Sequence, residues 1–296
     1  MRIRPCLLAL PLLALLAACS PAEKPGPAGP VNATARVADI PVAYTDIPGP
    51  GPAVVLIHGW NCDRGFWRFQ VPALTGGHRT LLLDLPGFGA SGKPEIAYTP
   101  ELFASAVVAV MDAAKVGKAA LVGHSMGFTV AREVARRHPG RALALVSVDG
   151  VLEHGADDPA ASRESMAQVA AFLDALRQDF AGTTAAFVES FFVEGTTPEL
   201  RREILAGMTG AAPQPAISAI EHLFAPDLWK VEPLDLPVLG VYADAPWLAP
   251  DTEAFFKRHF PRAEFTVMTG VGHFLHMEKP DQVNRLLTDF LGKLKG

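Results

Sequence analysis

The sequence is short of cysteine and of positive charge, and each shortage excludes a class of protein. Its 296 residues include three cysteines, and two of them, Cys6 and Cys19, lie near the N-terminus. Cys6 lies in a predicted signal peptide and Cys19 is a predicted lipidation site, as described below, so Cys62 is the one remaining thiol and no internal disulfide is expected. The scattered histidines have no zinc-ligand spacing. Lysine and arginine number 26 against 31 acidic residues, a formal charge of −5, and no basic stripe is present to neutralise phosphates. We therefore expect no metal, no cofactor and no nucleic-acid partner, and no protein partner is evident.

The N-terminal leader has the pattern of a secretory signal. Arg2 and Arg4 precede an almost wholly apolar run over residues 7–18, which is too short for a membrane-spanning helix. Residues 16–19, LAAC, resemble a bacterial lipoprotein box, in which the cysteine is acylated and becomes the mature N-terminus. The resemblance implies lipidation at Cys19. An ordinary signal peptide cleaved nearby is the alternative.

This interpretation divides the N-terminal region into a signal peptide over residues 1–18 and a tether over residues 19–32. Proline, alanine and glycine in the tether favour an extended, poorly packed segment. Losing Arg2 and Arg4 takes the side-chain charge from −5 to −7, so attachment would depend on acyl chains rather than on basic contacts with lipid. We expect an exported protein that is lipid-anchored to the bacterial inner or outer membrane and faces the periplasm or the cell exterior.

Downstream of the tether, apolar runs typical of buried strands alternate with stretches of helical spacing. This alternation favours right-handed crossovers, and so an α/β fold: a mostly parallel, twisted open sheet with helices on both faces. The expected strands are residues 53–57, 80–83, 119–122, 142–148, 237–243 and 264–268, and the expected helices include residues 66–74, 100–114, 130–138, 251–259 and 281–294.

The alternation stops between residues 152 and 230. Helical runs such as 165–180 and 184–193 occur there, with no convincing buried strand between them. We therefore predict one core domain, formed by residues 33–151 and 231–296, with a helical cap inserted over residues 152–230.

A serine stands between two glycines in GHSMG, residues 123–127, directly after an expected strand and before an expected helix. This context is typical of a nucleophile elbow, which strains the serine backbone and needs small neighbours because strand and helix approach closely. Gly123 and Gly127 meet that need. The elbow exposes the Ser125 hydroxyl at the carboxyl end of the sheet, near a helix N-terminus that stabilises an oxyanion. Ser125 is the predicted nucleophile.

With this elbow the chain resembles the α/β-hydrolase family, apart from the insertion. A second family motif, His-Gly after an earlier strand, matches IHGW at residues 57–60. The resemblance implies that the backbone N–H groups of Trp60 and Met126 form an oxyanion hole, with His58 and Gly59 shaping the loop. Aspartate-nucleophile members of the fold, such as haloalkane dehalogenases, do not fit a serine at the elbow.

A serine hydroxyl is a weak nucleophile at neutral pH and needs a base within hydrogen-bond reach. His273 lies in GVGHF, residues 270–274, between the last expected strand and the last expected helix, and it resembles the family's histidine loop. His276 is the competing candidate, but no glycine precedes it. His124, inside the elbow, is expected to line the pocket.

The histidine in turn needs a carboxylate partner to fix its tautomer. Many relatives place this acid just after the strand expected at 237–243, where the usual position falls on Pro246, which cannot serve. Some relatives take the acid from the strand that follows the nucleophile helix, and here Asp149 ends that strand. We assign the acid to Asp149, with Asp244 as the second choice and absence of a functional acid as the third.

Aromatic residues of the cap and of the loops around the elbow predict an apolar substrate pocket. The residues assigned to substrate binding are His58, Gly59, His124, Phe128 and Trp247. The expected function is a serine hydrolase that cleaves carboxylic esters of small hydrophobic substrates. A membrane-anchored ligand-binding lipoprotein without catalysis is one alternative, and a cofactor-free haloperoxidase or C–C hydrolase of the same fold is another.

Overall fold

The computed structural model describes residues 29–151, 159–225, 228 and 233–294. The predicted signal peptide (1–18), the lipidation site Cys19 and most of the predicted tether lie outside these residues. Strand β1 (Val31–Val37) begins two positions before the predicted start of the core. Among the described residues, no helix has both the length and the apolarity needed to cross a membrane.

Eight strands form one sheet in the order β1-β2-β4-β3-β5-β6-β7-β8. The β1–β2 and β2–β4 pairs are antiparallel, and every pair from β4 to β8 is parallel. The other strands are β2 (Ile40–Ile47), β3 (Gly51–Ile57), β4 (His78–Leu83), β5 (Ala119–His124), β6 (Ala142–Val148), β7 (Val238–Ala243) and β8 (Ala263–Met268). The predicted mostly parallel open sheet is confirmed.

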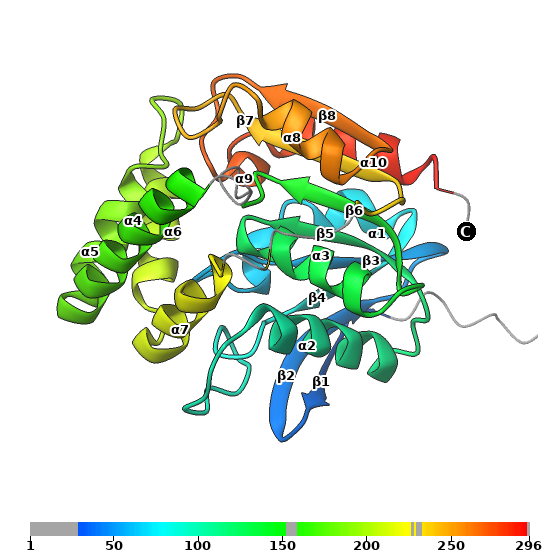
Figure 1. The fold of residues 1–296 in the computed structure, drawn as a ribbon. Helices are drawn as coiled ribbons and strands as arrows, with labels where there is room; N and C mark the ends of the chain where they lie inside the picture. Colours follow the sequence, from blue (N-terminus) through cyan, green and yellow to red (C-terminus); the bar gives the residue numbers. More distant parts are fainter. Residues whose placement is uncertain (1–28, 152–158, 226–227, 229–232, 295–296) are drawn as a thin grey trace, which may run out of the picture.

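Helices pack on both faces of this sheet (Figure 1). Side chains alternate along β3: Val55 and Ile57 belong to one apolar cluster, and Val54 and Leu56 to the other. The first cluster includes residues of α2 (Pro100–Ala113), α3 (Met126–Arg137) and α8 (Thr252–His259); the second includes residues of α1 (Val71–Thr75) and α10 (Pro280–Leu291). Two-sided burial explains why the central strands read as continuous apolar runs.

The helix predicted over residues 66–74 is instead two short elements. A 3-10 turn, η1 (Arg64–Trp67), precedes α1, which has Pro72 in its first turn. Proline lacks an N–H and clashes with the preceding turn, so it starts a helix rather than continuing one. The prediction of one continuous helix was wrong for this reason.

Helices α4 (Pro159–Gln178), α5 (Phe180–Glu189), α6 (Pro198–Thr209) and α7 (Pro213–Leu223) form a cap that lies beyond the sheet (Figure 1). These helices fall within the predicted insertion. The hydrogen bonds that fix α7 to the core include one from Trp60 Nε1 to the Ala216 carbonyl at 2.8 Å and one from the Tyr98 N–H to Ser218 Oγ at 3.0 Å.

The strand register brings the predicted site residues to one edge of the sheet. Ile57 of β3 pairs with Gly123 of β5, and His124 pairs with Val148 of β6. Val148 in turn pairs with Val241 of β7. The loops that follow these strands therefore meet at their carboxyl ends, which is where open α/β sheets bind ligands.

Candidate active site

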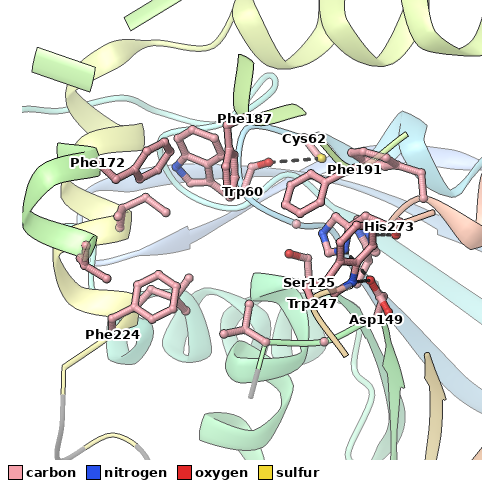
Figure 2. Close-up of a pocket in the computed structure, with 18 of the residues that line it drawn as sticks. Trp60, Cys62, Ser125, Asp149, Phe172, Phe187, Phe191, Phe224, Trp247 and His273 are labelled. Carbon is pink, nitrogen blue, oxygen red and sulfur yellow. Dashed lines mark hydrogen bonds and ion pairs between the residues drawn. The ribbon is translucent and has the colours of Figure 1, made fainter. Parts of the chain in front are cut away.

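Ser125 occupies a strained turn between β5 and α3. Its backbone has φ 52° and ψ −122°, a conformation that non-glycine residues rarely adopt. The two glycines allow backbone contact around it: a Cβ on Gly123 would lie 2.3 Å from the Gly127 carbonyl carbon, and one on Gly127 would lie 2.2 Å from the Ile57 oxygen. The elbow thus presents the Ser125 hydroxyl to the cavity under the cap (Figure 2).

Asp149 and His273 form a buried hydrogen-bonded pair in the same cavity. His273 Nδ1 donates to Asp149 Oδ2 at 2.6 Å, and Asp149 is 4% exposed. The carboxylate also accepts the Ala243 N–H at 2.9 Å and Trp247 Nε1–H at 3.1 Å. Because a carboxylate only accepts, the imidazole proton is on Nδ1 and Nε2 is left as the acceptor. This is the tautomer that a general base requires.

Asp244, the second choice for the acid, lies apart from this pair. Its side chain is exposed, and its backbone N–H continues the β7–β8 pairing by donating to the Met268 carbonyl at 2.8 Å. It does not line the cavity. The structure therefore brings Asp149, and not Asp244, to His273.

The loop after β3 places Gly59 and Trp60 on the cavity wall beside Ser125. His58 fixes this loop, since its Nδ1 donates to the Gly59 carbonyl at 2.7 Å and its Nε2 accepts the Leu85 N–H at 2.9 Å. Burial lowers the pKa of His58, which favours the neutral ring. No turn, loop or side-chain hydrogen bond of the described residues uses the N–H of Trp60 or Met126. Both amides are thus available to a ligand oxygen.

Two residues assigned to substrate binding do not line the cavity. His58 is fully buried, and its two ring nitrogens bind the Gly59 carbonyl and the Leu85 N–H, as described above. Phe128 lies one turn into α3, where its ring packs on Phe256 and Phe260, with centroids 5.9 and 5.6 Å away. It belongs to the core between α3 and α8. The expectation that these two side chains contact substrate was wrong.

His124 and His276 lie beside His273 without replacing it. His124 Nε2 donates to the His273 carbonyl at 2.9 Å, which ties the histidine loop to the end of β5. The His276 ring is fully buried against Trp67, with centroids 4.8 Å apart, and does not line the cavity. Burial lowers the pKa of His124 well below its usual value and that of His276 to about 3. Both rings stay neutral at physiological pH.

The cavity has a volume of about 400 Å³ and extends from the Ser125 hydroxyl to an aromatic end under the cap (Figure 2). The aromatic end is lined by Trp60, Phe172, Phe187 and Phe224, with aliphatic side chains from α6 and α7 between them. Cys62 also lines it, and burial raises the pKa of this thiol, so it stays protonated. In the part of the chain that the structure describes, no group of three or more His, Cys, Asp or Glu side chains could hold a metal ion.

Two contacts at the site have no pattern in the sequence that would reveal them, although Trp247 itself was assigned to the pocket. The indole N–H of Trp247 reaches Asp149 across 98 positions, and Phe191 of the cap stacks on the His273 ring with centroids 4.3 Å apart. Both contacts depend on how the cap and the loop after β7 fold over the sheet edge. Local periodicity does not report such contacts.

A serine at a strand-to-helix elbow and a histidine held by a buried aspartate, at the edge of a mostly parallel sheet under a helical cap, define an α/β hydrolase. The family model for the alpha/beta hydrolase fold matches residues 52–280. The chain therefore belongs to this family.

Curated relatives and solved structures within the family include esterases and a peroxidase. The chain is 30% identical over 275 residues to a pimeloyl-[acyl-carrier protein] methyl ester esterase of Xanthomonas campestris pv. campestris, a match that covers 85% of this chain and 99% of the relative. A thermophilic esterase from Thermogutta terrifontis superposes with a TM-score of 0.76 at 27% identity, covering 91% of this chain and 100% of that one. A bromoperoxidase from Bacillus anthracis gives a TM-score of 0.76 at 25% identity, with 89% and 100% covered.

Proposed function

We propose that this protein is a serine hydrolase that cleaves carboxylic esters of small hydrophobic substrates, with Ser125, His273 and Asp149 as its catalytic residues. The observation that carries the proposal is the 2.6 Å hydrogen bond from His273 Nδ1 to Asp149 Oδ2 in the cavity that Ser125 also lines. Esterases among the relatives support the same reaction class.

In the proposed reaction, Ser125 Oγ attacks the ester carbonyl carbon while His273 Nε2 takes the hydroxyl proton. The Trp60 and Met126 N–H groups receive the oxyanion, and Asp149 stabilises the imidazolium. The C–O bond then breaks, and His273 returns the proton to the leaving alcohol. His273 then deprotonates a water that attacks the acyl-enzyme carbonyl, and as the bond to Ser125 Oγ breaks His273 returns the proton to that oxygen and the carboxylic acid leaves.

A small side-chain movement precedes the first step. No hydrogen bond of the described residues joins Ser125 Oγ to His273, and Figure 2 shows the hydroxyl directed into the cavity. Rotation about the Cα–Cβ bond of Ser125 redirects that hydroxyl. Catalytic hydrogen bonds are often formed only when substrate is present.

The cavity lining supports hydrophobic acyl or alcohol groups as the bound part of the substrate. The aromatic end, with Trp60, Phe172 and Phe187 in mutual edge and tilted contacts, offers apolar surface. Thioesters and lactones present the same carbonyl chemistry to Ser125. A panel of p-nitrophenyl esters with increasing acyl length measures which part of this range the cavity prefers.

The decisive experiment is labelling with a fluorophosphonate probe together with hydrolysis of short-chain p-nitrophenyl esters, for the wild type and Ser125→Ala. We expect the wild type to be labelled and to turn over, and the variant to lose both, with kcat lower by more than about 10³-fold. A folded wild type that shows neither would favour a ligand-binding protein that keeps the fold without catalysis.

Halogenation is a second candidate activity, because one solved structure similar to this chain is a bromoperoxidase. The same Ser125 acyl-enzyme would react with hydrogen peroxide in place of water and release a peracid, which oxidises halide. Bromination assayed with acetate and peroxide, and compared with ester hydrolysis by the same preparation, ranks the two activities.

We also propose that the protein is exported and anchored through an acylated Cys19. The LAAC pattern at residues 16–19 supports this. Metabolic labelling with a palmitate analogue in a bacterial host should tag the wild type and not Cys19→Ala, and the variant should leave the membrane fraction. Equal fractionation of both proteins would contradict the anchor.

A further inference from the structure

The cap touches the catalytic histidine directly, at the turn that follows α5. The His273 N–H donates to the Phe191 carbonyl at 3.3 Å, and the Phe191 ring stacks on the imidazole at an interplanar angle of 28° (Figure 2). This turn is far from His273 in sequence. The orientation of the imidazole is therefore tied to the position of the cap.

The contact between the cap and the histidine loop is a contact between backbones. A Cβ placed on Gly272 would lie 2.1 Å from the Phe191 oxygen, a distance that no substitution tolerates. Glycine at this position lets the two chains approach closely. The contact therefore depends on groups that hold the two backbones at that distance.

Glu278 is placed to do this. It ends α9 (Leu275–Glu278), and its Oε2 accepts the Gly272 N–H at 2.5 Å. Its Oε1 accepts the Thr196 hydroxyl at 2.9 Å, and Thr196 is a buried residue of the cap turn. The two oxygens of one side chain thus bind the histidine loop and the cap.

The carboxylate holds this position without a cation. No Lys, Arg or His of the described residues forms an ion pair with Glu278, and partial burial raises its pKa. The Nζ of the neighbouring Lys279 instead donates to the Thr269 carbonyl at 2.9 Å. Placing a partly buried carboxylate between an N–H and an O–H donor costs desolvation, which these two hydrogen bonds offset in part.

We propose that Glu278 is a positioning residue that couples the cap to His273, so that cap placement and imidazole orientation are set together. The inference rests on the proposed function, because it takes His273 as the catalytic base. Glu278 does not contact substrate; it acts through Gly272 and Thr196.

Four variants test this role: Glu278→Ala, Glu278→Gln, Thr196→Val, and Glu264→Gln as a control. Glu264 is an exposed carboxylate of β8 that pairs with Lys293 at 2.7 Å, away from the cavity. The readouts are kcat and KM for a p-nitrophenyl ester, the rate of fluorophosphonate labelling, and peptide hydrogen exchange over residues 190–197 and 270–275.

We expect Glu278→Ala to lower kcat and the labelling rate by about 10- to 100-fold with KM changed less than about threefold, because the imidazole is displaced while the pocket remains. Glu278→Gln should recover to within about threefold of wild type, since its amide can accept from Gly272 and donate to Thr196 Oγ. Thr196→Val, which loses only the cap side of the bridge, should fall between them. The control should match the wild type.

Hydrogen exchange separates failure of this inference from failure of the proposed function. Loss of the bridge should raise exchange in both segments of Glu278→Ala, whether or not the wild type hydrolyses esters. Faster exchange in one segment alone, or a labelling rate within twofold of wild type in Glu278→Ala, would overturn the coupling. An inactive wild type would overturn the proposed function. Hydrogen exchange over residues 190–197 and 270–275 would then still show whether Glu278 holds the two segments together.

Discussion

The carboxyl ends of β6 and β7 lie side by side in the sheet, and each is followed by an aspartate. Asp149, after β6, is buried and accepts hydrogen bonds from Ala243, Trp247 and His273. Asp244, after β7, is exposed. The two residues have the same side chain and neighbouring strands, but only Asp149 is enclosed by donors.

The difference shows that β7 and its loop help to hold the Asp149 carboxylate, which β6 supplies. Ala243, the last residue of β7, and Trp247, in the loop that follows, both donate to the carboxylate that β6 contributes. The Asp149 backbone has φ 45°, a left-handed conformation that is unfavourable for aspartate and that persists only where the surroundings hold it. The hydrogen bonds from Ala243 and Trp247 therefore help to hold Asp149 in this strained backbone conformation at the edge of the sheet.

The sharpest test of the comparison is Asp149→Asn. Asparagine preserves the shape of the side chain but favours the wrong histidine tautomer, so kcat should fall by about 10⁴-fold. Stopped-flow or steady-state hydrolysis of a p-nitrophenyl ester measures it, with circular dichroism as the check on folding. A large loss in Asp244→Asn instead would reverse the assignment.

Trp247→Phe tests whether the hydrogen bond from the loop after β7 to Asp149 contributes to catalysis. The phenyl ring can keep the edge contact with Phe191, whose centroid lies 5.3 Å from that of Trp247, while the N–H to Asp149 is lost. Trp247 is 38% exposed, so water replaces part of the lost bond, and we expect kcat/KM to fall by about 3- to 10-fold.

The control for this prediction is Trp247→Phe in the Asp149→Asn background. The two effects should not add there, because the indole acts through the carboxylate. Full additivity would mean that Trp247 contributes through substrate packing alone.

The sheet and its order of elements were predictable because burial on both faces leaves apolar runs that need no tertiary information. The strand over residues 142–148 was predicted at the bounds that β6 has in the structure, and the predicted helix over 100–114 differs from α2 by one residue. The prediction of one helix over residues 66–74 was wrong because Pro72 starts a new helix there despite the helical spacing of the apolar residues. Of the cap, α4 and α5 were predicted in part.

For the candidate site, the sequence was informative where backbone geometry constrains residue type. The glycines around Ser125 and the loop glycine before His273 are required by contacts under 2.5 Å, so they mark those positions in the sequence. Phe128 was misplaced because closeness to Ser125 in sequence does not give the direction of a side chain on α3. The hydrogen bonds that join Glu278 to Thr196 and Trp247 to Asp149 span 82 and 98 positions, and single-sequence patterns cannot report such contacts.

A second side-chain hydrogen bond between β6 and β7 allows the effect of a substitution on stability to be measured apart from its effect on catalysis. The Tyr242 hydroxyl and Ser147 Oγ lie 2.7 Å apart, both buried, and burial raises the pKa of Tyr242 well above its usual value. Tyr242→Phe leaves the serine hydroxyl without its partner, which should cost about 1–3 kcal/mol of unfolding free energy. Thermal denaturation should show a Tm lower by roughly 2–10 °C, with kcat within about twofold. A tenfold loss of kcat at unchanged Tm would contradict a structural role.

The smallest effect is expected for Asp244→Asn, and that makes it the most exacting test of the comparison. The side chain is exposed and lies off the cavity, so the variant should keep kcat and KM within about twofold of wild type and change the unfolding free energy by less than about 0.5 kcal/mol. Because the backbone N–H of residue 244 carries the bond to Met268, the β7–β8 pairing survives the substitution. An intermediate loss of kcat that disappears at high salt would show that Asp244 acts on the His273 imidazolium at long range, since salt screens exposed charges and not the buried Asp149 pair.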